Sequence, residues 1–317
     1  MKLCVLGGLN WDIVTHVNAL PLPGETIKAR EVTENPGGKA LNQAVAAGRY
    51  GASVMLLGGI GDDEPGRKLC RFLDANAVDR RHVRRFRGAP TGTAHIHLAQ
   101  DGENMIVVHA GANDLYDANE VPIPDLHGCG VFLSQFEATP SAIKALFQSA
   151  SARQGTRILN AAPALVSERP LLDLADILVV NETELARFAE SANSPRTEDA
   201  LATAARTLMV RRDQSVVVTL GARGSLLVQH DTMDNVAGLN VPVIDTIGAG
   251  DCFCGVLAAG LCERKPLLLA LQEANAAAAF SVAHHGAAAS APTRNEVAAL
   301  RSQSGDLAQQ FSAPQHS

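Results

Sequence analysis

The segment Ile177-Leu178-Val179-Val180-Asn181-Glu182-Thr183-Glu184 predicts a buried strand that runs directly into a helix. Four consecutive apolar residues fit a strand covered on both faces, and residues 182–190 have helical spacing. The same alternation recurs on both sides, with strands expected at 131–134, 157–159 and 215–220 and helices at 139–152 and 197–211. Because strands that alternate with helices form parallel sheets, the predicted fold class is α/β, with a mostly parallel central sheet and helices on both faces.

Two segments in the first third of the chain have the pattern of short antiparallel strands. Residues 12–34 contain apolar runs broken by prolines and a glycine, and residues 93–109 contain two runs joined by a turn with Gly102. We expect these segments to form a small sheet, a lid over the carboxyl edge of the central sheet, where open α/β sheets bind ligands. No long linker interrupts the pattern, so residues 1–302 are expected to form one domain and residues 303–317 a flexible tail.

The composition is that of a mildly acidic globular protein. Of 317 residues, 46% are hydrophobic, which is enough for a large core, and the formal net charge is −6. Lysine and arginine do not gather into a basic run, so no nucleic-acid partner is expected. No segment has the roughly 18 apolar residues of a membrane span, and no signal peptide is evident, which favours the cytoplasm. Six scattered cysteines do not suggest a disulfide framework.

The strongest chemical signal is the glycine turn Asp245-Thr246-Ile247-Gly248-Ala249-Gly250-Asp251, which follows an apolar run and precedes a long apolar helix. Gly248 and Gly250 allow a tight turn that exposes backbone amides. The first amides of a helix have no partner within it and lie at the positive end of its dipole, so the turn predicts an anion hole suited to phosphate. Asp251 would sit among these amides. On its own it could also be an ordinary carboxylate of a first helical turn.

A second glycine pair precedes another predicted helix, in residues 35–43. Gly37 and Gly38 allow a ligand to approach the backbone closely, and Asn42 projects from one turn further on. The segment is not a P-loop, because the spacing of that motif is absent and Ala40 follows Lys39. The alternative is an ordinary helix start with a surface lysine.

Polar residues also follow two of the predicted strands. Asn10 and Asp12 lie at the end of the first strand and offer an amide and a carboxylate to hydroxyl groups. Asn181 and Glu184 follow the strand 177–180 and can share a helical face as oxygen ligands for Mg²⁺. The alternative for this second pair is a helix cap, with Asn181 as the N-cap and Glu184 three residues later.

Together these motifs resemble those of the ribokinase-like, or PfkB-type, carbohydrate kinases, over nearly the whole chain from Gly8 to about Pro292. The later signature is the glycine turn, and the earlier one is residues 37–48. Within this family, the stretches most similar to ribokinases are 23–26, 61–63, 109–113, 160–164 and 181–184. The chain departs from the family pattern at Ala40, where a glycine is usual, and in residues 284–290, which lack a proline.

The resemblance implies a role for each motif residue. The catalytic residues would be the base Asp251 and the anion-hole residues Gly248, Ala249 and Gly250. The sugar would be held by Asn10, Asp12, Gly38, Lys39, Asn42, Glu137 and Asp251. The nucleotide would be bound by Asn181, Thr219, Gly221, Gly224, Gly250 and Asn275. Mg²⁺ would be held through water by Asn181 and Glu184, and a monovalent cation, usually K⁺, by Asp245, Ile247, Ser281, His284, Gly286 and Ser290.

The activity that the resemblance implies is transfer of the ATP γ-phosphate to the 5-hydroxyl of D-ribose, in a homodimer joined through the lid. A kinase of another sugar, a sugar acid or a nucleoside stays open, because the motifs determine the chemistry better than the acceptor. A catalytically silent sugar-binding regulator is a more remote alternative. A nicotinamide-dependent oxidoreductase would share the α/β alternation, but no G-x-G-x-x-G follows the first strand.

Overall fold

The computed structural model describes residues 1–190 and 197–312, and its central feature is a nine-stranded sheet. The strands of this sheet are β1 (Lys2–Leu6), β4 (Val54–Gly61), β5 (Asp79–Phe86), β8 (Cys129–Gln135), β9 (Thr156–Asn160), β10 (Ile177–Asn181), β11 (Ser215–Thr219), β12 (Gly224–Val228) and β13 (Met233–Ala237). Their spatial order is β13-β12-β11-β10-β9-β8-β1-β4-β5. Neighbours are parallel except for the β11/β12 and β12/β13 pairs at one edge. The predicted mostly parallel sheet is therefore confirmed.

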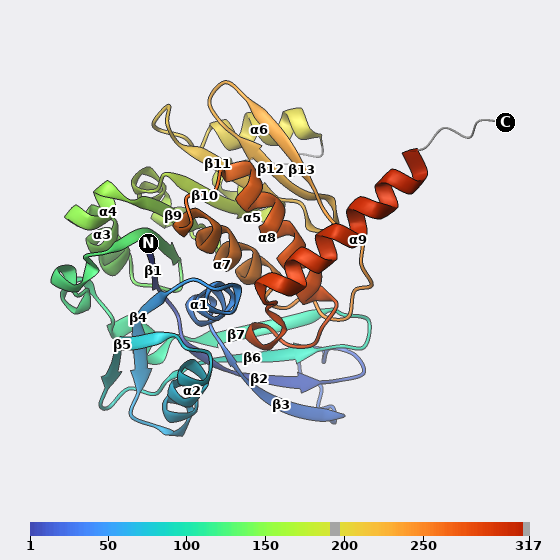
Figure 1. Ribbon diagram of the computed structural model, residues 1–317. Coiled ribbons are helices and arrows are strands. Elements are labelled where there is room, and N and C mark those ends of the chain that lie inside the picture. The colour runs from blue at the N-terminus through green and yellow to red at the C-terminus, as the bar shows by residue number, and fades with distance from the viewer. Residues whose placement is uncertain (191–196, 313–317) are drawn as a thin grey trace.

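Helices cover both faces of this sheet (Figure 1). They are α1 (Lys39–Tyr50), α2 (Glu64–Ala75), α3 (Pro140–Gln148), α4 (Ala150–Gln154), α5 (Glu182–Phe188), α6 (Glu198–Arg206), α7 (Ala249–Cys262), α8 (Leu267–Val282) and α9 (Arg294–Ser312). Leu3 and Val5 of β1 share one core with α1, α2, α7 and α8. Cys4 and Leu6 share the opposite core with α3, α5 and α6, because successive strand residues point to opposite faces. None of the described helices is long and apolar enough to cross a membrane.

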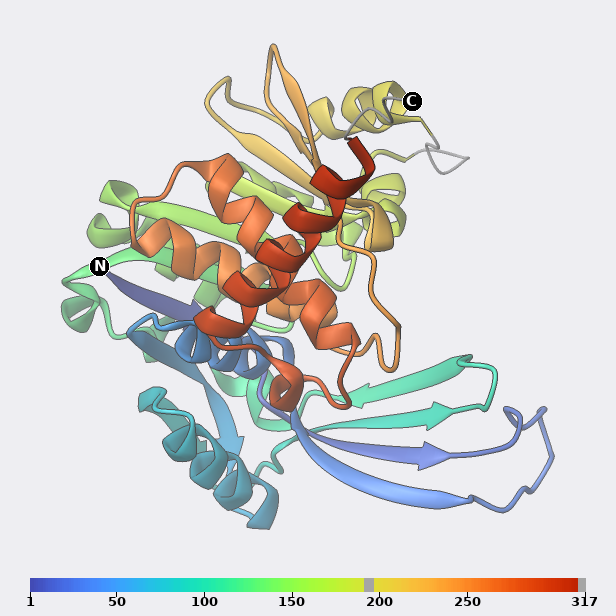
Figure 2. The same ribbon diagram turned by 45° about the vertical axis from the view of Figure 1, so that its right-hand side comes forward.

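A small separate sheet stands beside the central one. It contains β2 (Asn10–His16), β3 (Glu31–Gly37), β6 (Gly92–Leu98) and β7 (Asn104–His109) in the order β3-β2-β6-β7. Figure 2 shows this sheet projecting away from the body of the molecule. The predicted segments 12–34 and 93–109 do form it, although β2 begins earlier and β3 ends later than expected. Asn10 and Asp12, expected at the end of the first strand, instead belong to β2, since β1 ends at Leu6 and β2 starts at Asn10.

Several local features differ from the sequence-based expectation, and the antiparallel strands β12 and β13 are among the elements that were not predicted. The strand β5 was not predicted because its sequence, DRRHVRRF, belongs to a partly exposed edge strand and has no apolar run. The helix expected at 139–152 is two helices, and the Ser149 side chain between them caps α4 by accepting from the Ala152 amide. The last helix continues to Ser312 instead of ending at 302. Of the predicted flexible tail, residues 313–317 lie outside the described residues.

The close contact of α1 and α7 positions the polar residues of both helix starts. Gly255 of α7 faces α1 so closely that a Cβ on it would lie 2.4 Å from the carbonyl oxygen of Gln43. Larger residues at this crossing would separate the two helices. Both helices begin where the carboxyl ends of the parallel strands lie, which is the edge of the sheet that binds ligands in such folds.

Candidate active site

Asp251 lies in the first turn of α7, directly after the glycine turn. Gly248 begins this helix in the left-handed conformation, with φ of 78°. The Asp251 side chain is 6% exposed, and both of its oxygens accept hydrogen bonds from α1. Asn42 Nδ2 donates to Oδ2 over 3.0 Å, and Gln43 Nε2 donates to Oδ1 over 3.0 Å. The structure therefore joins the two glycine motifs of the sequence at one carboxylate.

Space for a ligand lies in front of the glycine turn. A Cβ placed on Gly250 would meet no atom within 4 Å, whereas one placed on Gly248 would lie 2.7 Å from the Cβ of Ala287. The turn is thus supported from behind and open in front. The first amides of α7 point along the helix axis toward this open side, where they can bind an anion.

A buried cluster of charged groups surrounds the start of α1. The Lys39 backbone amide donates to Glu137 Oε2 over 2.8 Å, which caps the first turn of α1 from the end of β8. Asp251, followed by Glu137 and Glu184, raises the pKa of the Lys39 ammonium, so this lysine stays charged. Burial raises the pKa of the Glu137 carboxyl, an effect that Lys39 opposes. Lys39 is therefore half-buried beside carboxylates and is not an ordinary surface lysine.

Asp12 reaches the same cluster from β2 of the small sheet. Burial, together with the charges of Glu137 and Asp251, raises its pKa to about 7. Its Oδ1 finds no hydrogen-bond partner among the described residues. The backbone at Gly37 passes so close that a Cβ there would lie 2.0 Å from Oδ2. An acceptor held this way is suited to a hydroxyl group of a ligand.

Asn10 is oriented by a residue that the sequence analysis did not assign to the site. Asn113 Nδ2 donates to Asn10 Oδ1 over 2.9 Å, and Asn113 Oδ1 accepts from the Leu9 amide over 3.0 Å. The Asn10 side chain is buried, and its Nδ2 is left as the donor for a ligand. Gly38 approaches the same strand, and a Cβ there would lie 2.5 Å from the Gly8 carbonyl oxygen. Its φ of 89° also favours glycine.

A cavity of about 340 Å³ extends from the glycine turn along the carboxyl side of the sheet. Five of the six residues predicted to bind a nucleotide line it, namely Thr219, Gly221, Gly224, Gly250 and Asn275. Leu239, Val243 and Phe253 give it apolar walls. Asn275 Nδ2 donates to the Val236 carbonyl over 2.9 Å, so this amide fixes the wall of the cavity. The cavity thus combines an apolar slot with the amides of the turn.

Asn181 does not line this cavity, and with Glu184 it forms the capping arrangement that was the alternative in the sequence. Asn181 Oδ1 accepts from the Glu184 amide, and Glu184 Oε2 accepts from the Asn181 amide, both over 2.8 Å. Burial raises the pKa of the Glu184 carboxyl, which also interacts with Lys39 and Asp251. An ionised carboxylate can accept about four hydrogen bonds, so the cap leaves room for a metal-bound water. The oxygen donors of this pair suit Mg²⁺.

The residues predicted to hold a monovalent cation are partly brought together. Asp245 Oδ1 accepts from the Ile247 amide and Oδ2 accepts from the Gly286 amide, each over 2.9 Å. The hydroxyls of Ser281 and Ser290 donate to local backbone carbonyls. His284 stacks on Phe280, and its Nδ1 lies 2.8 Å from the Phe280 carbonyl oxygen. The loop is ordered by these bonds and contacts the glycine turn through Ala287.

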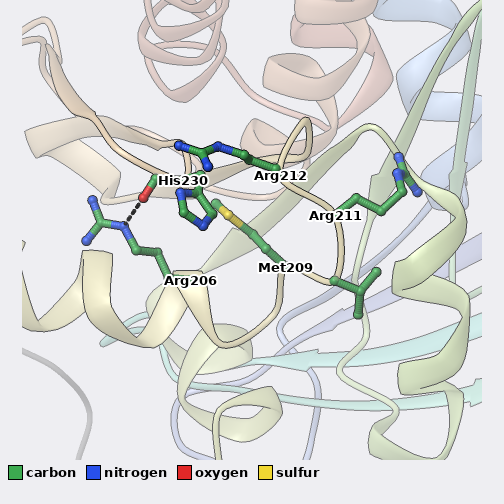
Figure 3. A pocket seen from close by; sticks show the side chains of 6 residues that line it. Arg206, Met209, Arg211, Arg212 and His230 are labelled. Carbon is green, nitrogen blue, oxygen red and sulfur yellow. Dashed lines mark hydrogen bonds between the residues drawn. The ribbon is translucent and has the colours of Figure 1, made fainter.

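A second cavity, of about 380 Å³, lies near the end of α6 and carries no comparable chemistry (Figure 3). Arg206 donates to three backbone carbonyls. Arg211 pairs with Asp176 over 2.9 Å. Arg212 pairs with Asp231 over 2.6 Å. Because these guanidinium groups already have acceptors in the protein, the smaller cavity beside the glycine turn is the candidate active site.

Comparison with known proteins agrees with this geometry. Residues 1–294 match the model of the pfkB family carbohydrate kinases, and the chain belongs to this family. The Bacillus subtilis ribokinase is 35% identical over 307 residues, which cover 95% of this chain and 99% of that protein. Among solved structures, Giardia lamblia ribokinase has a TM-score of 0.88 at 28% identity and covers 95% of this chain and 98% of its own. Arabidopsis thaliana ribokinase, complexed with ribose and ATP, has a TM-score of 0.82 at 30% identity, covering 94% and 98%.

The raised pKa of Asp12 predicts a pH-dependent cost to folding. The folded protein keeps a proton on this carboxyl up to about pH 7, whereas the unfolded chain releases it near 3.8, so stability falls as the pH rises between these values. We expect Asp12→Asn to raise the unfolding midpoint of the ligand-free protein, with a larger gain at pH 8 than at pH 5. Thermal unfolding at both values measures this, and an equal gain at both would contradict it.

Proposed function

We propose that this chain is an ATP-dependent ribokinase that transfers the γ-phosphate of ATP to the 5-hydroxyl of D-ribose. The observation that carries the proposal is the position of Asp251. Its carboxylate lies between a group of polar side chains and a cavity. On one side are Asp12, Lys39 and Asn42, polar groups suited to hydroxyls. On the other is the cavity that reaches Gly250. The ribokinases named above, one of them solved with ribose and ATP, support the choice of substrates.

In this proposal Asn10, Asp12, Gly38, Lys39, Asn42 and Glu137 hold the sugar. Asp251 takes the proton of the attacking hydroxyl as the oxygen bonds to the γ-phosphorus and ADP leaves. The backbone amides at Gly248, Ala249 and Gly250 stabilise the charge on the transferring group. Positioning and electrostatic stabilisation supply most of the rate in phosphoryl transfer, and general-base help adds about 10²–10⁴-fold.

We further propose that Asn181 and Glu184 hold waters of the Mg²⁺ that accompanies ATP, and this ion would supply charge neutralisation on the phosphates. The nucleotide itself would lie in the cavity lined by Thr219, Gly221, Gly224 and Asn275. A monovalent cation, K⁺, would bind in the loop of Asp245, Ile247, Ser281, His284, Gly286 and Ser290. Its role there would be to fix the glycine turn, since this loop contacts Gly248 through Ala287.

The small sheet is proposed to act as a lid and to join two subunits. Its edge strand β7 exposes four consecutive apolar side chains, with Met105 50%, Ile106 54%, Val107 63% and Val108 52% exposed. An exposed apolar edge strand of this kind favours pairing with another chain. Residues 1–302 as a single domain and a cytoplasmic location stay predictions.

The substrate assignment is tested by ADP release in the presence of ATP and Mg²⁺, with and without K⁺. Ribose is expected to give the highest kcat/KM among ribose, deoxyribose, fructose, ketodeoxygluconate and nucleosides, and K⁺ is expected to raise it. Best turnover with a nucleoside would refute the ribokinase assignment. Sugar binding without turnover of any acceptor would instead indicate a silent binding protein.

The role of Asp251 is tested by Asp251→Asn, which keeps the shape of the side chain but removes the base. We expect kcat to fall about 10²–10⁴-fold while the dissociation constant for ribose changes little, because other groups hold the sugar. Steady-state kinetics and calorimetric titration with ribose measure the two quantities. A loss of affinity as large as the loss of turnover would assign Asp251 to binding instead.

The dimer is tested by placing a charge on β7. Val107→Lys is expected to convert a dimer into a monomer, because a charge on this exposed apolar edge strand disfavours its pairing with another chain. Val210→Lys is a matched control, since Val210 is 59% exposed but lies outside the small sheet. Light scattering after size exclusion gives the mass of each. A wild-type protein that is monomeric at micromolar concentration would contradict the proposal.

A further inference from the structure

Behind Asp251, two buried amide side chains run from the carboxylate into the central sheet. Gln43 of α1 is fully buried, and its Nε2 lies 3.0 Å from Asp251 Oδ1 and 3.3 Å from Asn160 Oδ1. Asn160 ends β9, and its Nδ2 donates to the Val179 carbonyl of β10 over 3.3 Å. The carboxylate is therefore connected to the backbone of two parallel strands.

The orientation of this chain of amides is determined by its partners. The Val179 carbonyl can only accept, so Asn160 must turn its Nδ2 toward β10 and its Oδ1 toward Gln43. Gln43 then faces two acceptors, a carboxylate oxygen and an amide oxygen, and must present Nε2 to both. A flipped Gln43 would place its oxygen against the Asp251 carboxylate. The backbone of β10 thus determines which group of Gln43 meets the base.

The two oxygens of Asp251 consequently have different environments. Oδ1 is held on the inner side by Gln43, which is 0% exposed. Oδ2 is held by Asn42, whose own Oδ1 has no hydrogen-bond partner within the described part of the chain. Gln43 Oε1 is unpaired there as well, but Asn42 is 7% exposed and Gln43 0%, so the Asn42 side is the one that a substrate hydroxyl can reach.

We propose that Gln43 and Asn160 are positioning residues for the general base and that Oδ2 is the oxygen that takes the proton. The proposal rests on Asp251 being the base. In the step, the O–H bond of the sugar breaks as an Oδ2–H bond forms. The sugar oxygen bonds to the γ-phosphorus, whose bond to the bridging oxygen of ADP breaks. Gln43 Nε2 donates to Asp251 Oδ1 during the whole step, and this hydrogen bond keeps the carboxylate from rotating.

A purely structural role for Gln43 is disfavoured by its unsatisfied oxygen. In the described structure Gln43 Oε1 is buried and has no partner, which destabilises the fold. An apolar residue of the same length would avoid that cost but would leave the buried oxygens Asp251 Oδ1 and Asn160 Oδ1 without their donor. The amide therefore serves these two oxygens, one of which belongs to the base.

Several other charged or titratable groups interact electrostatically with Asp251. They are Asp12, Lys39, Glu137, Glu184, Cys252 and Cys254. All of them remain in place when Gln43 alone is changed. A shift in the pH profile of a Gln43 variant therefore reports the loss of its hydrogen bond.

The test compares Gln43→Leu and Gln43→Glu with the wild-type enzyme, using ribose and ATP. Gln43→Leu is expected to lower kcat about 10- to 100-fold with the ribose KM nearly unchanged, because a hydrogen bond to a charged group is lost. The acid limb of the kcat–pH profile should move to higher pH, since the carboxylate loses a donor. Gln43→Glu should move it further, because two carboxylates then share the site. Asn160→Leu should produce a smaller shift in the same direction.

Gln214→Leu is a matched control, because Gln214 is also buried but donates to the backbone carbonyls of Leu172 and Ala175. It should lower the unfolding midpoint and leave kcat and its pH profile unchanged. Circular dichroism and ATP binding establish that each variant is folded. If Gln43→Leu does not fold, Asn160→Leu replaces it in the test. Wild-type kcat and an unmoved acid limb in a folded Gln43→Leu or Asn160→Leu variant would overturn the positioning role alone. An Asp251→Asn variant that keeps its activity would show that Asp251 is not the base, and the positioning proposal would then fail as well.

Discussion

The close packing of α1 against α7 is the constraint on which the candidate active site depends. At Gly255 the two helices are so near that any side chain would meet the Gln43 carbonyl. This contact places Asn42 and Gln43, from the first third of the chain, against Asp251, more than two hundred residues later. A small separation would lengthen both hydrogen bonds beyond useful range, because such bonds weaken steeply with distance. Packing in the core thus controls the geometry of the base.

The same packing forces several charges into a small volume. Glu137, Glu184 and Asp251 all interact there with the Lys39 ammonium, and Asp12 interacts with Glu137 and Asp251. Burying carboxylates without full compensation is unfavourable, and the raised pKa values of Asp12, Glu137 and Glu184 express that cost. A sugar that donates hydroxyl hydrogens would relieve it. The ligand-free site is therefore suited to ligands that donate hydroxyl hydrogens. The folded protein gives up some stability at these residues, and ligand binding gains affinity from them.

The sequence was sufficient for the central parallel strands of the sheet, and less so for its edge strands and for contacts between distant side chains. The runs 131–134 and 177–180 predicted their strands because buried parallel strands are continuously apolar. β5 was not predicted because an exposed edge strand lacks a continuous apolar run. Gln43 directly follows Asn42 in the motif of residues 35–43, yet its proposed role depends on Asn160 and Val179, whose proximity only the fold creates. Asn113 was missed for the same reason.

Capping and ligand binding were alternatives for Asn181 and Glu184 in the sequence, but the geometry of the fold makes them compatible. Glu137 caps α1 through the Lys39 amide, and Asn181 and Glu184 cap α5. Helices of a parallel α/β sheet begin near the carboxyl ends of the strands, which is also where ligands bind. A polar residue that caps such a helix is therefore already at the ligand edge, held rigidly by its bond to the backbone. Since an ionised carboxylate has more acceptor positions than a cap uses, the same side chain can order the helix and still accept from a ligand.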